Sequence, residues 1–533
     1  MYGTSNNFID PNYYNGKFAE RKELEQDYKW VDLNDPYGET KAAGTCISVE
    51  YDKHGKVCKI LVDDSESNTL IVSNTGSGKT RRVLSPYILS CIKALESFVC
   101  HDPKGELYMF FVELLKKYGY DVFIINLREP LKGHRFNILQ KPAQLYREGN
   151  EDRALEIVSN IAESIFSVIA DKEDLFWTEV AKSLFICYFI MAVDLYPPEE
   201  VSLKTIYRIH IEGMVKMGAS TALAVYLDAH KESKAYEHGI YTVTAPNDTR
   251  NSIFAVFSGG ISRLIINDAI SDTLSDSSEG IENISNEKKP TAVFIITRDE
   301  APGTYSTVVA STIDLIYTSL IDQAQSREGL ILPRRVHFIL EEFGNIAALN
   351  NINNMLTASR SRGIRIVAVV QSLSQLDLIY NEKLSRNLIG NFHNLIYMNS
   401  TDMELVEIIS KRCGTYINPY TNSSEPLLSP NLLTHLDKKR GETLMLLDRH
   451  YPYIAYLPDM SCYKDIVPIS RFDVDERKLL KKHYGRLTQH VKDIISRRAD
   501  GQRNTDAFGR ELSKEARDRK LKIMETIIES DKE

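Results

Sequence analysis

Residues 70–80 read Leu-Ile-Val-Ser-Asn-Thr-Gly-Ser-Gly-Lys-Thr, and this stretch decides the fold. An apolar strand runs into a glycine-rich turn, and residues 80–93 continue as a helix that Pro86 is expected to kink or shorten. The order of strand, glycine turn, Lys-Thr and helix is typical of a phosphate-binding loop. Ser73 replaces the first glycine of the usual pattern, at a position that shapes the turn and does not touch phosphate.

The loop predicts a site for ATP and Mg²⁺, and its context disfavours the alternative of a chance Gly-Ser loop. Its two glycines let successive backbone N–H groups point at phosphate oxygens, and the helix N-terminus adds positive potential. Lys79 is expected to reach the β- and γ-phosphates, and the Thr80 hydroxyl to bind Mg²⁺. The predicted nucleotide contacts are Asn74, Thr75, Gly76, Ser77, Gly78, Lys79, Thr80 and Arg81.

A second apolar strand, residues 336–340, ends in the acidic pair Glu341-Glu342. A P-loop enzyme needs a carboxylate at the end of a neighbouring strand, because the metal and the attacking water must be held there. We predict that Glu341 holds Mg²⁺ through water and that Glu342 orients or activates the attacking water. Aspartate is commoner at the first position, so the longer Glu341 is expected to shift the metal. A solvated acidic pair at a strand end is the alternative.

Three arginines, Arg360, Arg362 and Arg365, precede a strand at 366–370 that ends at Gln371. An amide at a strand end beside the phosphate loop can sense the γ-phosphate. Arg360 has the place from which a ring ATPase presents an arginine finger to its neighbour's nucleotide. On composition alone, a solvated or salt-bridged helix end is the favoured interpretation of any one of these arginines.

Strand–helix alternation on both sides of a long helical region predicts an α/β fold whose mainly parallel sheet is interrupted by an all-α domain. Residues 47–51 and 57–62 are expected to form a hairpin before the phosphate loop. The predicted organisation is an N-terminal arm or docking segment (1–45), a nucleotide-binding domain (46–149 and 287–470), an all-α domain (150–286) and a charged helical tail (471–533).

The composition excludes several classes of protein. The net charge of −8 argues only weakly against DNA binding, because a motor that grips DNA inside a pore does not need a basic exterior. The seven cysteines contain no CxxC pair, which favours a reducing cytoplasm over a disulfide scaffold or a zinc site. No signal peptide is visible, and no apolar run is expected to reach the ~18–20 residues of a membrane span. Residues 183–193 come nearest, and we expect them to form a buried helix.

The order of these motifs resembles the TraG-like coupling proteins of type IV secretion and conjugation. The family usually has Asp-Glu where this chain has Glu341-Glu342. The similarity covers about residues 68–460. It rests on residues 75–80, 102–106 (Asp-Pro-Lys-Gly-Glu), 127–139, 176–188 and 340–344, on Arg360 with Gly363, and on residues 371–376.

The resemblance implies a RecA-like P-loop domain that carries an all-α domain and assembles into a hexameric ring around a DNA channel. It implies an ATP-driven coupling protein that recruits relaxase–DNA substrate and pumps DNA, single-stranded in the favoured case, through a conjugative type IV secretion channel. Most members carry N-terminal transmembrane helices, which this sequence does not show. We therefore expect a cytoplasmic chain at the inner face of the membrane, held by a membrane subunit, with residues 1–45 as a candidate dock.

Two other functions stay open. A chromosome-segregation or repair translocase of the FtsK/HerA type shares the phosphate loop, although residues 102–106, the helical region and residues 371–376 favour a coupling protein. A receptor that binds ATP without hydrolysing it, and presents the helical domain to secretion substrates, is supported only by Glu341. ATP turnover measured with and without single-stranded DNA separates the receptor from the motor.

Overall fold

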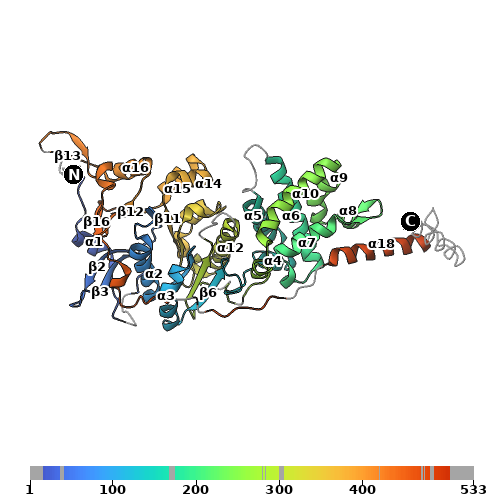
Figure 1. Ribbon diagram of the computed structural model, residues 1–533, viewed down its shortest axis with the longest axis horizontal. Helices are drawn as coiled ribbons and strands as arrows, with labels where there is room; N and C mark the ends of the chain where they lie inside the picture. Colours follow the sequence, from blue (N-terminus) through green and yellow to red (C-terminus); the bar gives the residue numbers. More distant parts are fainter. Residues whose placement is uncertain are drawn as a thin grey trace, which may run out of the picture. The chain divides into compact units, whose positions relative to one another are not determined.

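The computed structural model describes residues 16–504, except 36–40, 167–174, 279, 282–283, 299–304, 419, 470–471, 473 and 481–484. The chain divides into two compact units (Figure 1), which we call the sheet unit (Met1–Phe136 and Ser277–Leu479) and the helical unit (Asn137–Asp276 and Leu480–Glu533). These joins differ from those expected at 149/150 and 286/287. The difference arises because α4 (Gln140–Arg147) packs against α5 (Glu151–Phe166) and so belongs with the helices.

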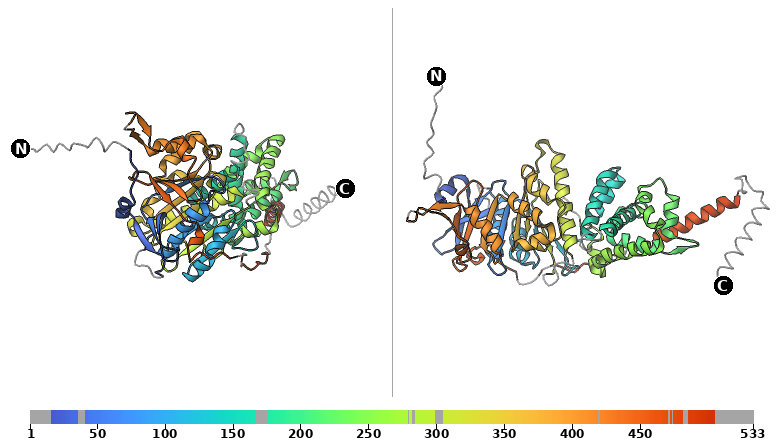
Figure 2. Two further views of the ribbon diagram at one scale, coloured as in Figure 1. Left: turned by 60° about the vertical axis from the view of Figure 1, so that its left-hand side comes forward. Right: turned by 90° about the horizontal axis from the view of Figure 1, so that it is seen from above.

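Among the described residues, nine strands form the central sheet of the sheet unit, in the order β16-β15-β12-β4-β11-β10-β5-β9-β6. The seven strands from β12 to β6 are parallel, and β15 and β16 add antiparallel at one edge. The right-hand view of Figure 2 shows strands of this sheet side by side. In the order of the sheet, the bounds are Tyr453–Tyr456, Glu442–Leu446, Asn394–Asn399, Thr69–Ser73, Ile364–Val370, Val336–Leu340, Ser97–His101, Thr291–Ile296 and Asp121–Asn126.

Helices cover both faces of the sheet. Successive side chains of a strand point to opposite faces, and in β10 Ile339 joins the apolar core that contains α2 and α3. Its neighbour Phe338 lies against Tyr317 of α12, with ring centroids 6.4 Å apart. The larger helices of this unit are α1 (Arg21–Asp27), α2 (Ser85–Ala94), α3 (Glu106–Lys117), α12 (Ser306–Gln325), α13 (Ile352–Thr357), α14 (Leu373–Tyr380), α15 (Glu382–Asn391) and α16 (Met403–Cys413).

Pro86 alters the helix behind the phosphate loop, as expected. Proline has no N–H to donate, and the chain begins this helix with a π-helical turn over Thr80–Leu84. The Ser85 N–H reaches back to the carbonyl of Thr80, and α2 follows with Pro86 in its first turn, where the missing donor costs nothing.

Much of the segment expected to be an arm or dock belongs to the sheet unit. Residues 16–35 and 41–45 contain α1 and β1 (Lys29–Asp32), and β1 pairs with β3 (Val57–Asp63) of the predicted hairpin. The other hairpin strand is β2 (Thr45–Tyr51). Residues 1–15 lie outside the described part of the chain. The sequence showed no helical or strand periodicity in residues 16–35 because their buried apolar side chains are few and widely spaced.

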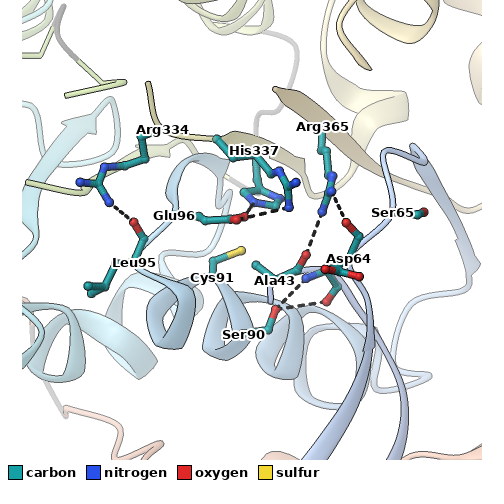
Figure 3. Close-up of polar contacts among 12 residues, drawn as sticks. Ala43, Asp64, Ser65, Ser90, Cys91, Leu95, Glu96, Arg334, His337 and Arg365 are labelled. Atoms are coloured by element: carbon teal, nitrogen blue, oxygen red, sulfur yellow. Dashed lines mark hydrogen bonds and ion pairs between the residues drawn. The ribbon is translucent and has the colours of Figure 1, made fainter. Parts of the chain in front are cut away.

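A buried polar cluster lies at the amino ends of β10 and β11, at the edge opposite the phosphate loop (Figure 3). His337 contacts Glu96 through Nε2 (2.6 Å) and the Tyr87 hydroxyl through Nδ1 (2.7 Å). Arg365, one of the three arginines considered for a helix end, is instead a buried residue of β11 that donates to the carbonyl of Ala43 (2.8 Å). The cluster joins the amino ends of β10 and β11 to Glu96, which lies just beyond the carboxyl end of α2. The opposite ends of these three elements carry the candidate site.

The helical unit is built around α6 (Leu175–Leu195), which is buried on most sides. By length and composition, α6 is the one helix among the described residues that could cross a membrane, but most of it is buried inside the helical unit. The expectation that no run is long enough was therefore wrong, because helix continues on both sides of residues 183–193. Its burial is that of a core helix. The other helices are α7 (Leu203–Gly213), α8 (Ala222–Ala229), α9 (Lys234–Thr244), α10 (Asn247–Ser262) and α11 (Asp268–Thr273).

Two features of the helical unit differ from expectation. A two-stranded ribbon, β7 (Lys216–Met217) with β8 (Ser220–Thr221), interrupts the helices. The tail expected from residue 471 becomes helical only at α18 (Arg486–Asn504), and it is not fully solvated. Leu487 and Val491 are buried, and α18 packs on α7 and α8. Residues 505–533 lie outside the described part.

The helical unit is expected to lose stability in acid through His210. This side chain is buried between the Tyr188 hydroxyl (3.2 Å from Nδ1) and the Ser258 hydroxyl (2.8 Å from Nε2), and burial lowers its pKa to about 4. The unfolded chain takes up the proton near pH ~6.5, whereas the folded chain resists it until about pH 4. The free energy of unfolding should therefore fall as the pH drops from 7 towards 4. Thermal melts at pH 7.5 and pH 5 should show a smaller difference for His210→Gln than for the wild type, and an equal difference would contradict this.

Candidate nucleotide site

Three segments that sequence alone places far apart meet at the carboxyl edge of the sheet. The phosphate loop follows β4, Gln371 follows β11, and Glu341 follows β10. β11 pairs in parallel with both β4 and β10, so the three strand ends lie side by side. This arrangement is the one the motif order predicted.

The closest link between the predicted metal residues is a hydrogen bond. The Thr80 hydroxyl donates to Glu341 Oε1 at 2.7 Å. Burial raises the pKa of the Glu341 carboxyl, while this hydrogen bond and the charge of Lys79 act in the opposite direction. A hydroxyl and a carboxylate are thus held together at the start of the helix.

The backbone of the loop has the conformation that its glycines allow. Gly76 and Gly78 have φ of +76° and +96°, in the left-handed region, and nothing lies within 4 Å of where a Gly76 side chain would begin. Ser73 is the last residue of β4, so this position does not need the freedom of glycine. Its hydroxyl contacts that of Ser77, whose Oγ also donates to the carbonyl of Asn74 at 2.8 Å.

Gln371 lies beside the loop, as predicted for a sensor of the γ-phosphate. Its Oε1 accepts a hydrogen bond from the Thr75 hydroxyl at 3.3 Å. Its backbone carbonyl accepts from Ser400 Oγ at 3.1 Å, which fixes the end of β11. The amide is therefore in contact with the loop on which phosphates would lie.

Glu342 occupies a conformation that is uncommon for a residue with a side chain. Its φ and ψ are +55° and +48°, and its Oε2 accepts from Asn345 Nδ2 at 3.0 Å. Left-handed backbone at a non-glycine residue is often found at functional sites. The turn separates the directions of Glu341 and Glu342, which suits two different roles for the two carboxylates.

Lys79 and Arg81 differ in their surroundings. Lys79 has an exposed fraction of only 7%, and its charge acts on Glu341. The Arg81 guanidinium makes a two-point ion pair with Asp459, with both contacts at 2.6 Å. The side chain of Arg81 is therefore engaged by protein, and its backbone N–H, in the first helical turn, is the group that remains for a nucleotide.

Arg360 lies at the other edge of the sheet. It belongs to a 3₁₀ turn, Arg360–Arg362, directly before β11, and its Nη1 is 2.7 Å from His393 Nε2. β11 extends about 20 Å at ~3.3 Å per residue, so Arg360 cannot reach the phosphate loop of its own chain. The preceding helix, α13, ends at Thr357, so Arg360 lies beyond it.

Two buried residues at the end of β5 were not predicted as site residues. His101 Nδ1 is 2.7 Å from the carbonyl of Glu341, and burial lowers its pKa to about 4, so a neutral ring donates this hydrogen bond. Asp102 accepts from the backbone N–H of Tyr108 at 2.9 Å through Oδ2, while its buried Oδ1 has no hydrogen-bond partner among the residues that the structure describes. Burial and the nearby Glu341 raise the pKa of Asp102 to about 8. The signal was available, because residues 102–106 (Asp-Pro-Lys-Gly-Glu) are among the segments that carry the family resemblance.

These residues fit ATP with Mg²⁺. A pocket of about 100 Å³ lies against Asn74, Thr75, Gly76 and Ser77, on the side of the loop that faces the end of β12. No group of three or more His, Cys, Asp or Glu side chains among the described residues could hold a metal by itself. Nucleotide-bound Mg²⁺ does not need one, because phosphates and water supply most of its ligands. The Thr80 hydroxyl with Glu341 is the donor set that such a site requires.

Known proteins that resemble this chain include conjugative DNA-transfer proteins. The family model described as Type IV secretory system Conjugative DNA transfer matches residues 19–448. VirD4 proteins of Agrobacterium fabrum (strain C58) and Rhizobium rhizogenes are 24% and 23% identical over 372 residues, which is 68% of this chain and 52% of each relative. The chain thus spans about half the length of these curated relatives.

Solved structures show the fold. The plasmid coupling protein TrwB with the ATP analogue ADPNP matches with a TM-score of 0.61 and 16% identity, over 87% of this chain and 97% of that one. TrwB with ADP and Mg²⁺ matches with a TM-score of 0.58 at the same identity, over 87% and 95%. The expected fold class, a RecA-like P-loop domain with a mainly parallel sheet interrupted by helices, is confirmed, as is the resemblance to coupling proteins. The family model covers most of the chain, and this protein therefore belongs to the type IV secretory system conjugative DNA transfer family.

Proposed function

We propose that this chain is an ATPase that binds ATP with Mg²⁺ at the Asn74–Thr80 loop and uses hydrolysis to drive DNA through a conjugative type IV secretion channel. The observation that carries the proposal is the 2.7 Å contact between the Thr80 hydroxyl and Glu341. It joins the two groups that must share a magnesium ion, although they are 261 positions apart in the sequence. The solved TrwB complexes with ADPNP and with ADP and Mg²⁺ support the choice of ligand.

Each side chain then has a distinct task. Lys79 would neutralise the β- and γ-phosphates, and Thr80 and Glu341 would together hold the metal. Bound Mg²⁺ would supply positive charge that stabilises the transferring phosphoryl group and returns the pKa of Glu341 to lower values. Glu342 orients the attacking water. Gln371 contacts the γ-phosphate and so couples its presence to the end of β11.

Family membership supports a proposal for the larger assembly. We propose a homohexameric ring that surrounds DNA, with single-stranded DNA as the favoured substrate, and a helical unit that receives relaxase and its bound DNA. A membrane subunit of the secretion channel would hold the chain at the inner face of the membrane. Arg360 is compatible with such a ring, because it lies at the edge of the sheet opposite the phosphate loop of its own chain.

The test is ATP hydrolysis by the purified chain, measured alone, with single-stranded DNA and with duplex DNA of equal length. A DNA-pumping motor should hydrolyse ATP faster with its DNA substrate, because DNA nucleates the ring. Binding of ATP without turnover under all three conditions would favour the non-hydrolysing receptor. A preference for duplex DNA would favour a translocase of the FtsK/HerA type.

Glu342→Gln should keep ATP binding and lose hydrolysis. The amide retains the shape of the side chain and its contact with Asn345, but it lacks the negative charge that orients water. The rate should fall by about 10²–10⁴-fold, while a fluorescent ATP analogue should bind as it does to the wild type. Glu341→Asp is the matched variant: it keeps the carboxylate and restores the residue usual in the family, so its activity should be retained or raised. Normal hydrolysis by Glu342→Gln would move the catalytic role to another residue.

A further inference from the structure

The chain leaves the last strand of the sheet as a long segment that packs against the sheet unit, with Leu457, Met460, Tyr463 and Ile466 buried in its core. We call residues 457–479 the strap, and residue 480 begins the second part of the helical unit. The family model ends at residue 448, so the strap lies outside the region matched by the family. Apart from one short 3₁₀ turn, Met460–Cys462, and a single bridge between Tyr463 and Val57, its described residues form neither helix nor strand. Its position depends on side-chain contacts and on isolated backbone hydrogen bonds.

The strap begins on the turn that holds the phosphate-binding residues. Arg81 Nε and Nη2 each lie 2.6 Å from a carboxylate oxygen of Asp459, and Arg82 Nη1 donates to the carbonyl of Leu457. Consecutive arginines of the π-helical turn thus bond alternate residues of the strap. Two-point arginine–carboxylate pairs are the strongest of partly exposed ion pairs, because they fix orientation as well as distance. The Arg81 guanidinium accordingly holds the pKa of Asp459 well below its usual range.

Close packing supports this contact. Gly441 has φ of +72°, and a side chain there would begin only 2.1 Å from the carbonyl oxygen of Leu457 and 2.6 Å from Arg82 Nη1. The Leu457 N–H in turn donates to the carbonyl of Gly441 at 3.0 Å. Glycine is therefore required at this position, and the start of β15 presses the strap against the arginine turn.

Further along, the strap contacts the sheet unit at points remote from the phosphate loop. Asp465 pairs with Lys93 at 2.9 Å, near the far end of α2. Phe472 stacks on Tyr108 of α3, with ring centroids 5.2 Å apart and an interplanar angle of 4°. The Arg477 N–H donates to the carbonyl of Leu131 at 2.8 Å, two residues before the strap ends. The strap thus runs from the phosphate-binding turn to the residue at which the helical unit begins.

We propose that Asp459 is a positioning residue of the nucleotide site, which sets Lys79 and Thr80 by holding Arg81 and transmits their position to the strap. The proposal rests on the proposed ATPase function and adds to it a residue outside the family region. Thr80 is followed directly by Arg81, so the orientation that Asp459 imposes on Arg81 also fixes the backbone from which the Thr80 hydroxyl reaches Glu341. Loss of the ion pair should therefore raise the Mg²⁺ concentration that the enzyme requires while the chain stays folded.

The test compares two asparagine substitutions in the full chain. Asp459→Asn removes the carboxylate beside Arg81, and Asp465→Asn removes a carboxylate of the same strap that pairs with Lys93, away from the loop. Asp459→Asn should lower kcat for ATP by about 10- to 100-fold and raise the Mg²⁺ concentration needed for half-maximal rate. Asp465→Asn should leave both quantities unchanged. The melting temperature of Asp465→Asn should nevertheless fall at least as much as that of Asp459→Asn, because Lys93, the partner of Asp465, is more buried than Arg81.

Two further variants separate positioning from general loosening. Asp459→Glu keeps the carboxylate and should recover part of the activity, and Arg81→Gln combined with Asp459→Asn should be no worse than either change alone. Equal loss of kcat in Asp459→Asn and Asp465→Asn, or an unchanged Mg²⁺ requirement in Asp459→Asn, would overturn the proposal.

The result also distinguishes this inference from the function on which it rests. If the wild type binds a fluorescent ATP analogue but does not hydrolyse ATP, the ATPase proposal fails. The Mg²⁺ dependence of analogue binding then replaces the rate as the readout, and Asp459→Asn must shift it for the inference to stand. If the wild type binds no nucleotide, both fail together.

Discussion

Lys79→Ala should abolish ATP turnover while the chain stays folded. The ammonium group is nearly buried, with an exposed fraction of 7%, and it has two effects at the site. It provides a point charge for the phosphates, and it opposes the rise in the pKa of Glu341 that burial causes. Removing it therefore costs the phosphates a partner and makes the metal carboxylate harder to ionise. We expect the rate to fall by about 10²–10³-fold or more.

The measurement is steady-state ATP hydrolysis beside a thermal melt of the same sample. Lys116→Ala is the matched control, because Lys116 is an exposed lysine of α3 whose ion pair with Glu113 is local to that helix. The control should hydrolyse ATP as the wild type does, since exposed pairs contribute little to stability. Lys79→Ala with wild-type turnover would remove the phosphate loop from the proposed mechanism.

The sequence was sufficient to predict a mainly parallel sheet and the meeting of two of its strand ends. An apolar run ending in Gly-Ser-Gly-Lys-Thr and another ending in Glu341-Glu342 predict two parallel strands whose ends meet, and the 2.7 Å contact between Thr80 and Glu341 agrees with that placement. These predictions depend on local chemistry. Buried parallel strands are apolar along their whole length, and the groups that bind phosphate must follow them directly.

The sequence was insufficient where position depends on contacts between distant segments. The pairing of Arg81 with Asp459 joins residues 378 positions apart, and no spacing rule connects them. Burial lowers the pKa of His101 and, together with Glu341, raises that of Asp102, and this environment becomes visible only when β5 is known to lie next to β10. Residues 16–45 showed no period because a short helix and a four-residue strand give too few positions to establish one.

Arg360→Ala should leave ATP binding intact and reduce hydrolysis, and the defect should depend on a neighbouring subunit. In the folded chain Arg360 lies at the amino edge of the sheet, with Nη1 at 2.7 Å from His393 Nε2, while the phosphate loop is at the carboxyl edge. Because the two lie at opposite edges of the sheet, Arg360 cannot act on the nucleotide bound by its own chain. A guanidinium that reaches the next subunit's γ-phosphate is typically worth about 10³–10⁵ in rate, so we expect a loss in that range.

The decisive measurement mixes two inactive proteins, Arg360→Ala and Lys79→Ala. If Arg360 acts on a neighbouring nucleotide, some interfaces of a mixed ring combine an intact phosphate loop from one subunit with an intact arginine from the other. Activity should then partly return, and it should depend steeply on protein concentration or on DNA that nucleates the ring. Arg362→Ala is the matched control, because it removes a neighbouring arginine of the same turn whose Nη1 donates to the nearby carbonyl of Leu330 at 3.3 Å. If mixed rings form and stay inactive, Arg360 is a structural partner of His393 and the site gains no arginine from its neighbour.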